Sequence, residues 1–202
     1  MEIIDLSVPI DDKTPVYPGD PKQEITHISS VEKDGWNEHR LTFNTHFSTH
    51  IDAPWHMIKD GKKLSEYPLE RFIGDGVVVD VRKGFDAKRL DDAKITTNSI
   101  VLIFTDHCKN LHNNYFEGAK FMPPEFAWKL AKLKPKMVGM DTFSPDAPPF
   151  EIHKILLGAD VLLIENLMNL DKLAGKKCKV FALPLALRNI DGAQCRAVAV
   201  IE

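Results

Sequence analysis

Four residues whose side chains bind metals or carry protons lie close together between Thr45 and Met57, in the stretch THFSTHIDAPWHM. They are His46, His50, Asp52 and His56. Imidazole nitrogens and carboxylate oxygens are common ligands of zinc, manganese and iron(II), and a ligand set without cysteine favours a catalytic over a structural site. A catalytic metal lowers the pKa of its water to about 7, which makes hydroxide available at neutral pH. The stretch therefore predicts part of a metal centre, with one histidine free to carry a proton.

The backbone must bend for these groups to meet. His46, His50 and Asp52 would share one face of a strand, because side chains alternate along it. At about 3.3 Å per residue, a straight strand would place His46 and His56 about 33 Å apart, which is too far for one ion. Pro54 fits the first turn of a helix, so we expect a sharp bend after Asp52 that folds His56 back over the ligands. His46 and His50 could also converge from one helical turn.

A metal with three ligands in one segment usually needs at least one from elsewhere, and α/β proteins place such groups at strand ends. Glu165 ends the apolar run DVLLIE, where a buried carboxylate requires a cation or several donors. Asp106 and Asp141 also follow predicted strands, and His153 lies on a short predicted helix. Residue types and positions alone do not choose among these four candidates.

The elements that must position these residues form a mixed pattern, richer in strand than in helix. Short β-branched runs predict buried strands, and MPPEFAWKLAKLKP is the clearest helix. We expect strands over residues 1–10, 24–32, 38–50, 74–82, 99–106, 136–143, 160–167, 178–187 and 195–202, and helical segments over 122–135, 148–160 and 169–175. Pro184 indicates an edge or bulged strand. The fold class is α/β, with one domain over residues 1–202.

Composition restricts the class of protein. The chain has 202 residues, 44% of them hydrophobic and 27% charged, with a formal net charge of −3. Interspersed charges of both signs give no basic footprint for nucleic acid and no polybasic membrane patch. Cys108, Cys178 and Cys195 are odd in number and scattered, which predicts reduced thiols in a cytoplasmic protein. The amino-terminal stretch MEIIDLSVPIDDKTP lacks the features of a signal peptide.

The stretch HFSTHIDAPWH resembles the H-x-G-T-H-x-D-x-P-x-H signature of the cyclase family of metal-dependent hydrolases, which includes bacterial kynurenine formamidase and isatin hydrolase. Nearly the whole chain takes part in the resemblance. VYPGDP is similar to an aromatic-Pro-Gly-Asp segment of the family, and GMDTFSPD is similar to a Gly-hydrophobic-Asp-Thr-x-Ser segment. A histidine-bearing helix, a strand ending in ENL and a final RAVAVI strand follow as in the family.

The resemblance implies a role for each matching residue. His46, His50 and Asp52 would bind a first metal, and His153 and Glu165 would complete a second site that Asp52 and Glu165 bridge. His56 would donate and accept the proton, and Tyr17 would line the substrate pocket.

The resemblance also implies the cofactor, assembly and reaction. One or two divalent ions are expected per chain, with zinc usual in formamidases and manganese in the isatin-cleaving branch. The implied fold is a barrel-like sheet with flanking short helices, of the swivelling β/β/α type, assembled as a homodimer or a higher homo-oligomer. The implied reaction is hydrolysis of the carbon–nitrogen bond of a small amide by metal-bound hydroxide, as an arylformamidase of tryptophan catabolism performs it.

Three departures from the family pattern affect the substrate rather than the metal chemistry. Ser48 replaces a glycine of the signature, and Tyr17 stands where formamidases often have tryptophan. IFTDHCKN replaces an Arg-Thr-Gly-Trp run, which puts Phe104, Asp106 and His107 at positions that often shape the pocket.

Two alternatives remain open. The same site could open or close the ring of a lactam, a lactone or a polyketide-like substrate. The chain could also be a non-catalytic relative with structural ions, although such a site would be closed by four protein ligands and would not need His56.

Overall fold

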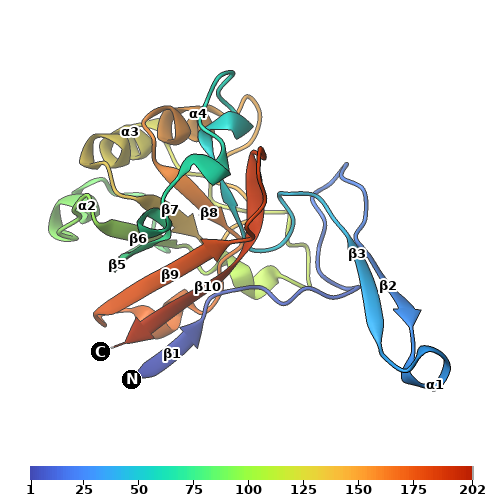
Figure 1. The fold of residues 1–202 in the computed structure, drawn as a ribbon. Helices are drawn as coiled ribbons and strands as arrows, with labels where there is room; N and C mark the ends of the chain where they lie inside the picture. Colours follow the sequence, from blue (N-terminus) through green and yellow to red (C-terminus); the bar gives the residue numbers. More distant parts are fainter. Residues whose placement is uncertain (202) are drawn as a thin grey trace.

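The computed structural model describes residues 1–201 (Figure 1). The strands are β1 (Glu2–Asp5), β2 (Glu24–Ser29), β3 (Glu38–Thr42), β4 (His50–Asp52), β5 (Ile73–Asp80), β6 (Ser99–Phe104), β7 (Met137–Met140), β8 (Leu162–Glu165), β9 (Cys178–Pro184) and β10 (Gly192–Ile201). The α-helices are α1 (Val31–Asp34), α2 (Lys88–Asp92), α3 (Pro124–Leu133) and α4 (Glu151–Gly158). Short 3-10 helices are η1 (Pro54–His56), η2 (Leu64–Glu66), η3 (Leu69–Phe72), η4 (His107–Asn110) and η5 (Leu170–Leu173).

The main sheet closes on itself. Its strands follow the order β10-β4-β8-β7-β6-β5-β9, and β9 pairs again with β10. Strands β5 to β8 run parallel to one another, whereas β4, β9 and β10 run antiparallel to their neighbours. Closure leaves no unpaired strand edge within the ring. Strand β1 pairs with the C-terminal part of β10, from Val198 to Ile201. The prediction of a strand-rich α/β fold with a barrel-like core is therefore confirmed.

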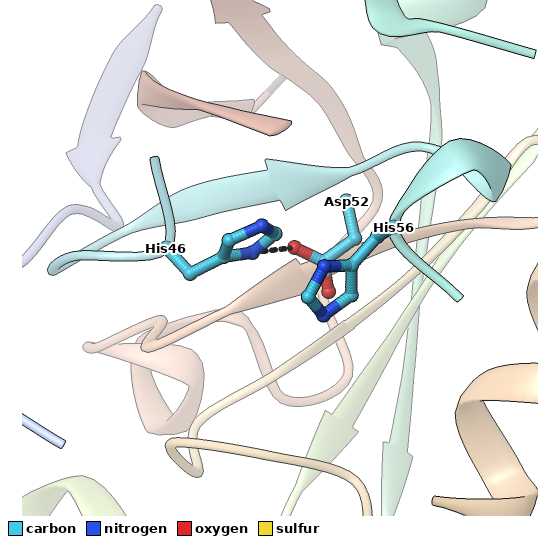
Figure 2. A group of neighbouring side chains, drawn as sticks. All are labelled: His46, Asp52 and His56. Atoms are coloured by element: carbon cyan, nitrogen blue, oxygen red, sulfur yellow. Dashed lines mark hydrogen bonds and ion pairs between the residues drawn. The ribbon is translucent and has the colours of Figure 1, made fainter. Parts of the chain in front are cut away.

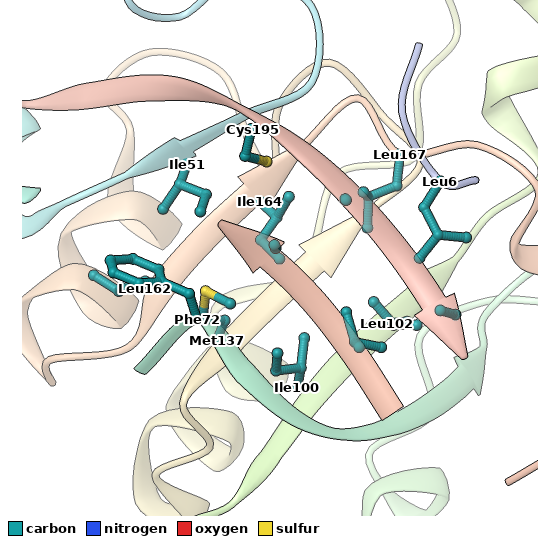
Figure 3. Close-up of a cluster of buried hydrophobic side chains, with 14 of the residues drawn as sticks. Leu6, Ile51, Phe72, Ile100, Leu102, Met137, Leu162, Ile164, Leu167 and Cys195 are labelled. Atoms are coloured by element: carbon teal, nitrogen blue, oxygen red, sulfur yellow. The ribbon is translucent and has the colours of Figure 1, made fainter. Parts of the chain in front are cut away.

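Apolar side chains fill both sides of this sheet. Along β6, Ile100 and Leu102 belong to the cluster inside the ring, while Val101 and Ile103 belong to a second cluster outside it. This division follows from the alternation of side chains along a strand. Figure 3 shows the inner cluster, in which Ile51, Ile164 and Leu6 lie between the strands. The predicted strands with two covered faces are thus confirmed.

Helices α3 and α4 cover the outer cluster (Figure 1). Phe126 and Leu130 of α3 and Leu156 of α4 are fully buried there. The helix predicted over 122–135 is confirmed as α3, which has Pro124 at its start and ends before Pro135. Among the residues that the structure describes, no helix combines the length and the apolar character that a membrane span requires.

The strand predicted over 38–50 is wrong in its second half. Strand β3 ends at Thr42, and the chain turns until β4 begins at His50. Ser48 has a φ of 58°, in the left-handed region, which no extended strand contains. His46 therefore lies in a turn and not on the face of a strand. The helical turn predicted at Pro54 is confirmed as η1.

Strand β9 is not an edge strand, because it pairs with β5 on one side and with β10 on the other. Pro184 is its last residue and lies beyond Phe181, where the pairing with β5 ends. A proline at that point interrupts no central ladder. The five-residue helix α2 was not predicted by the sequence.

Candidate metal centre

The pairing of β4 with β8 brings the two halves of the site together. In this antiparallel register His50 lies opposite Glu165, although 115 residues separate them in the chain. Asp52 lies two residues further along β4 on the same face as His50. The end of β8 therefore supplies the carboxylate that the histidine-rich segment lacks.

His46, Asp52 and His56 form the outer part of the site (Figure 2). The left-handed Ser48 turns His46 back, so that its Nδ1 lies 2.8 Å from Oδ1 of Asp52. On the other side of Asp52, η1 places the His56 ring 3.9 Å from that of His46, measured between centroids. The bend expected after Asp52 thus brings the first and last histidines of the segment together.

His50, Asp52 and Glu165 form the inner part of the site and are all buried. His50 Nδ1 lies 2.8 Å from the carbonyl oxygen of Ser48, and a carbonyl only accepts, so Nδ1 carries the proton. His50 Nε2 then carries no proton and has a free electron pair. It lies 3.2 Å from Oδ1 of Asp52 and 3.4 Å from Oε2 of Glu165. This is the tautomer that a metal-ligating histidine requires.

His153 approaches the same point from α4. Its Nε2 lies 3.2 Å from Oε1 of Glu165 and 3.8 Å from Oδ2 of Asp52. Its Nδ1 lies 2.6 Å from Oδ1 of Asp146, whose other oxygen accepts hydrogen bonds from the backbone N–H groups of Ile152 and His153. Asp146 therefore holds the ring with Nε2 facing Glu165.

The electrostatics of the centre favour a cation. Burial raises the pKa of Glu165, and the negative charge of Asp52 raises it further. Although burial alone would raise the pKa of Asp52, the neighbouring His50 and His46 hold it well below its usual range. Burial lowers the pKa of His46, but the Asp52 and Asp191 carboxylates outweigh it and raise that pKa to about 10. Two buried carboxylates side by side thus require positive charge nearby, and the raised pKa of His46 supplies part of it.

Unpaired atoms show that a divalent ion fits this arrangement. His50 Nε2, Asp52 Oδ2 and Glu165 Oε1 are buried and have no hydrogen-bond partner. Leaving such atoms unpaired is costly, and these three belong to residues that face one another. One nitrogen and two carboxylate oxygens form a ligand set suited to zinc or manganese. His46 differs, because both of its nitrogens already face carboxylates, those of Asp52 and Asp191.

Asp191 is a member of the site that sequence reasoning missed. Its Oδ2 lies 2.7 Å from His46 Nε2 and 3.4 Å from His56 Nδ1. The loop before β10 carries it, and the backbone N–H of Ala53 donates to its carbonyl oxygen. Only the register of β10 against β4, which pairs Gly192 with Asp52, brings it here. The sequence around Asp191 gave no sign of this contact.

The structure separates the four candidates for the second half of the site. His153 and Glu165 lie at the centre, whereas Asp141 accepts hydrogen bonds from the Thr105 backbone and hydroxyl and from the Asp106 backbone. Asp106 itself forms an ion pair with Lys109. The carboxylates of Asp141 and Asp106 are therefore engaged in fixing the loop after β6.

Another residue that sequence reasoning missed, Asn166, connects this loop to the centre. Its Nδ2 donates to the Ser48 carbonyl oxygen at 2.9 Å, the same oxygen that accepts from His50. Its Oδ1 accepts from the hydroxyl of Tyr115 at 2.9 Å. Asn166 directly follows Glu165, so one chain segment supplies both a candidate ligand and the group that fixes the orientation of His50.

A cavity of about 640 Å³ opens onto the centre, and His46, His56, His153 and Glu165 line its floor. Its walls include the aromatic side chains of Tyr17, Phe116, Phe143 and Phe150. The Tyr17 ring lies edge-on to Phe116, with 5.7 Å between centroids. This shape suits a flat, largely apolar group beside a polar reactive end.

Imidazoles and carboxylates gathered at the floor of such a cavity, on this barrel-like α/β fold, define a hydrolase of the metal-dependent class. Residues 4–147 match the model of the Cyclase family, whose description is "Putative cyclase". The chain belongs to this family, as the resemblance in the sequence predicted.

Relatives and solved structures agree with this assignment. The kynurenine formamidase of Geobacillus thermodenitrificans (strain NG80-2) is 31% identical over 202 residues, which cover 96% of this chain and 95% of the relative. The kynurenine formamidase of Bacillus cereus (strain ATCC 14579) is 29% identical, over 98% of this chain and 96% of the relative. Isatin hydrolase A from Labrenzia aggregata, bound to benzyl benzoate, has a TM-score of 0.88 and 27% identity, covering 98% of this chain and 93% of that one. An isatin hydrolase bound to the product analogue thioisatinate has a TM-score of 0.89 at 24% identity. The match covers 100% of this chain and 93% of that one.

Proposed function

We propose that this protein is a metal-dependent hydrolase that cleaves the carbon–nitrogen bond of a small aryl amide, as a kynurenine formamidase does. The observation that carries the proposal is the convergence of His50, Asp52 and Glu165 beside a cavity with aromatic walls. Each of the three is buried and has one side-chain atom without a hydrogen bond, namely His50 Nε2, Asp52 Oδ2 and Glu165 Oε1. The 31% identity to a kynurenine formamidase over nearly the full length supports the choice of an amide substrate. One hydrolase domain over residues 1–202 carries the activity.

The proposed ligands are His46, His50, Asp52, His153 and Glu165. When bound, a divalent ion would polarise the substrate carbonyl and make water nucleophilic at neutral pH. Asp52 belongs to both candidate ligand groups, His46–Asp52–His56 and His50–Asp52–Glu165. Where two ions bind, the proposal is that Asp52 and Glu165 would be shared between them. Zinc is the proposed metal, with manganese as the alternative, and one or two ions per chain.

His56 is the proposed catalytic residue that moves the proton. Burial lowers the pKa of His56 below its ordinary value, and this outweighs the opposing effect of the Asp52 carboxylate, so the neutral ring that can accept a proton is favoured. It lines the cavity next to the proposed ligands. As water adds to the carbonyl carbon, His56 takes a proton from it and then gives a proton to the leaving nitrogen, which departs as a neutral amine. The other product is the carboxylic acid.

The aromatic walls define the substrate class. Tyr17 and Phe143, with 6.1 Å between ring centroids, lie on the same side of the cavity as Phe116. An N-formyl aryl amine would place its ring among these residues and its formyl group beside His56. Tyr17 is the proposed substrate-binding residue. The protein is further proposed to act in the cytoplasm, in tryptophan catabolism.

Ring opening of a lactam is a second candidate function. The 27% identity and the TM-score of 0.88 to isatin hydrolase A from Labrenzia aggregata favour it, because isatin is a cyclic aryl amide. Attack at the carbonyl and proton transfer by His56 would be the same, but the leaving nitrogen would remain tethered to the product.

Metal content and turnover test the proposal together. We expect mass spectrometry of purified protein to find one or two zinc or manganese ions per chain, and N-formylkynurenine to be hydrolysed faster than isatin or a simple lactone. Chelation should abolish turnover, and adding metal back should restore it. Faster cleavage of isatin would favour the second candidate function. Metal-loaded protein that hydrolyses none of the three substrates would contradict both.

A further inference from the structure

Residues 105–117, which follow β6 and which we call the support loop, are held in shape by hydrogen bonds. At the start of the support loop, Asp141 accepts hydrogen bonds from the hydroxyl and from the backbone N–H of Thr105. Further along, His107 Nε2 lies 2.6 Å from the carbonyl oxygen of Tyr115, and because a carbonyl oxygen only accepts, Nε2 donates. These bonds fix the backbone at Tyr115.

The side chain of Tyr115 points into the protein. It is 4% exposed, and its ring lies 5.3 Å from that of His107 and 5.7 Å from that of Phe143, measured between centroids. Its hydroxyl donates to Oδ1 of Asn166 at 2.9 Å. Burial raises the pKa of Tyr115 above its ordinary value, so the hydroxyl keeps the proton that it donates. A rigid ring thus presents a permanent donor to Asn166.

Only one orientation of the Asn166 amide suits both of its neighbours. The Ser48 carbonyl oxygen can only accept, so Nδ2 must face it, at 2.9 Å, and Oδ1 must face Tyr115. The same carbonyl oxygen accepts from His50 Nδ1 at 2.8 Å. A continuous line of buried hydrogen bonds therefore leads from the Tyr115 hydroxyl to the imidazole of His50.

The backbone of Ser48 depends on this line. Its φ of 58° is in the left-handed region, which is unfavourable for a residue with a side chain and persists only where contacts hold it. The contacts are the bond from its hydroxyl to the Val8 carbonyl oxygen and the two bonds that its own carbonyl oxygen accepts. Loosening Asn166 would therefore allow Ser48 to turn, and the carbonyl that orients His50 would turn with it.

We propose that Tyr115 is a positioning residue of the metal centre. It acts through Asn166 and the Ser48 carbonyl oxygen, and it keeps Nε2 of His50 facing the two buried carboxylates. This inference rests on the proposed function, because it requires that His50 binds the ion. Groups that orient ligating histidines contribute about 10–100-fold to metal affinity, and Tyr115 acts from further away, so its hydroxyl should contribute about 10-fold.

The neighbouring residue Phe116 belongs to a different part of the site. Phe116, unlike Tyr115, lines the cavity, and its ring lies 5.7 Å from that of Tyr17 between centroids. Two consecutive residues of the support loop therefore serve different ends, Tyr115 the metal centre and Phe116 the substrate. This division provides a matched pair of variants.

Tyr115→Phe keeps the ring and removes only the hydroxyl. We expect competition with a chromophoric chelator to give Tyr115→Phe a metal dissociation constant about 10-fold above that of the wild type, with KM at saturating metal unchanged. Phe116→Leu should raise KM and leave the metal dissociation constant unchanged. The visible absorption of the Co²⁺-substituted protein should change in Tyr115→Phe and not in Phe116→Leu, whereas a loss of stability alone would not alter this spectrum.

A double-mutant cycle tests whether Tyr115 acts through Asn166. In an Asn166→Ala background, Tyr115→Phe should cause no further loss of metal affinity, because the line of hydrogen bonds is already broken. Asn166→Asp, whose carboxylate cannot donate to the Ser48 carbonyl oxygen, is the second background if Asn166→Ala does not fold.

Two results would overturn this inference alone. One is a wild type that binds metal with the same affinity as Tyr115→Phe. The other is an equal loss of affinity from Tyr115→Phe with and without Asn166, which would show that Tyr115 acts by another route. A wild-type chain that binds no metal would overturn the proposed function and this inference together.

Discussion

His153 Nδ1 lies 2.6 Å from Oδ1 of Asp146, and both residues are buried. The other oxygen of Asp146 accepts the Ile152 N–H at the start of α4, so one carboxylate fixes both the helix and the histidine that it carries. A histidine held in this way directs Nε2 toward the metal centre as the correct tautomer. Asp146 is thus a positioning residue for His153.

Replacing Asp146 should weaken metal binding without removing a ligand. We expect Asp146→Ala to raise the metal dissociation constant by about 10–100-fold, because groups that orient ligating histidines contribute this much. Asp146→Asn should lose less, since its amide oxygen still accepts from Nδ1. Titration with a chromophoric chelator measures the effect, and the exposed Asp171→Ala is the control. An unchanged affinity in Asp146→Ala would show that His153 needs no orienting group.

His56 and His50 should respond differently to removal. His56→Ala should keep its metal and lose about 10²–10⁴-fold in kcat, the usual contribution of a positioned proton-transfer group. His50→Ala should lose metal, because its free Nε2 is at the centre of the inner ligand group. Metal analysis and steady-state kinetics separate the two outcomes, with surface His112→Ala as the control. Wild-type turnover in His56→Ala would contradict the assigned role.

Removing the metal should lower thermal stability, because Asp52 and Glu165 would be left buried beside one another. Metal at 100 times its dissociation constant stabilises a protein by about 2.7 kcal/mol, which for a chain of this size corresponds to about 5–10 °C in Tm. Differential scanning calorimetry before and after chelation measures this shift. Asp52→Asn should show little response to the chelator. An equal response in Asp52→Asn would mean that the chelator acts elsewhere.

Gly192 should not tolerate a larger side chain. A Cβ at this position would lie 2.7 Å from the Ile51 carbonyl oxygen and 2.9 Å from Cε1 of His46. Gly192→Ala should therefore destabilise the fold by about 1–3 kcal/mol, as overpacking does, and should reduce metal content by displacing His46. Denaturant unfolding and metal analysis check this.

Gly158→Ala serves as the matched control for that substitution. Gly158 ends α4, and the nearest atom to an added Cβ would lie 3.9 Å away. Alanine there should be neutral or should stabilise by up to about 1 kcal/mol through helix propensity. Equal destabilisation by the two substitutions would mean that the close approach at Gly192 has no special cost.

Much of the fold was predictable because the signals are local. The β-branched runs of β5 and β6, and the prolines at both ends of α3, each determine structure within a few residues. The end of β3 at Thr42 and the turn before β4 were not predictable, because the left-handed conformation of Ser48 depends on its long-range contacts. Its hydroxyl donates to the carbonyl oxygen of Val8, and its own carbonyl oxygen accepts from Asn166.

The sequence by itself determined the residue types of the centre and their grouping in one bent segment, because four potential ligands and a proline lie within eleven consecutive positions. Only the tertiary structure decided which distant groups join them. The pairing of His50 with Glu165 and of Gly192 with Asp52 arises from strand register, which depends on how the whole ring closes and packs. Asp191 enters the site for the same reason, since it reaches His46 across 145 residues of chain. Asp146 lies only seven residues before His153, but no sequence pattern indicated that its carboxylate would turn toward that ring.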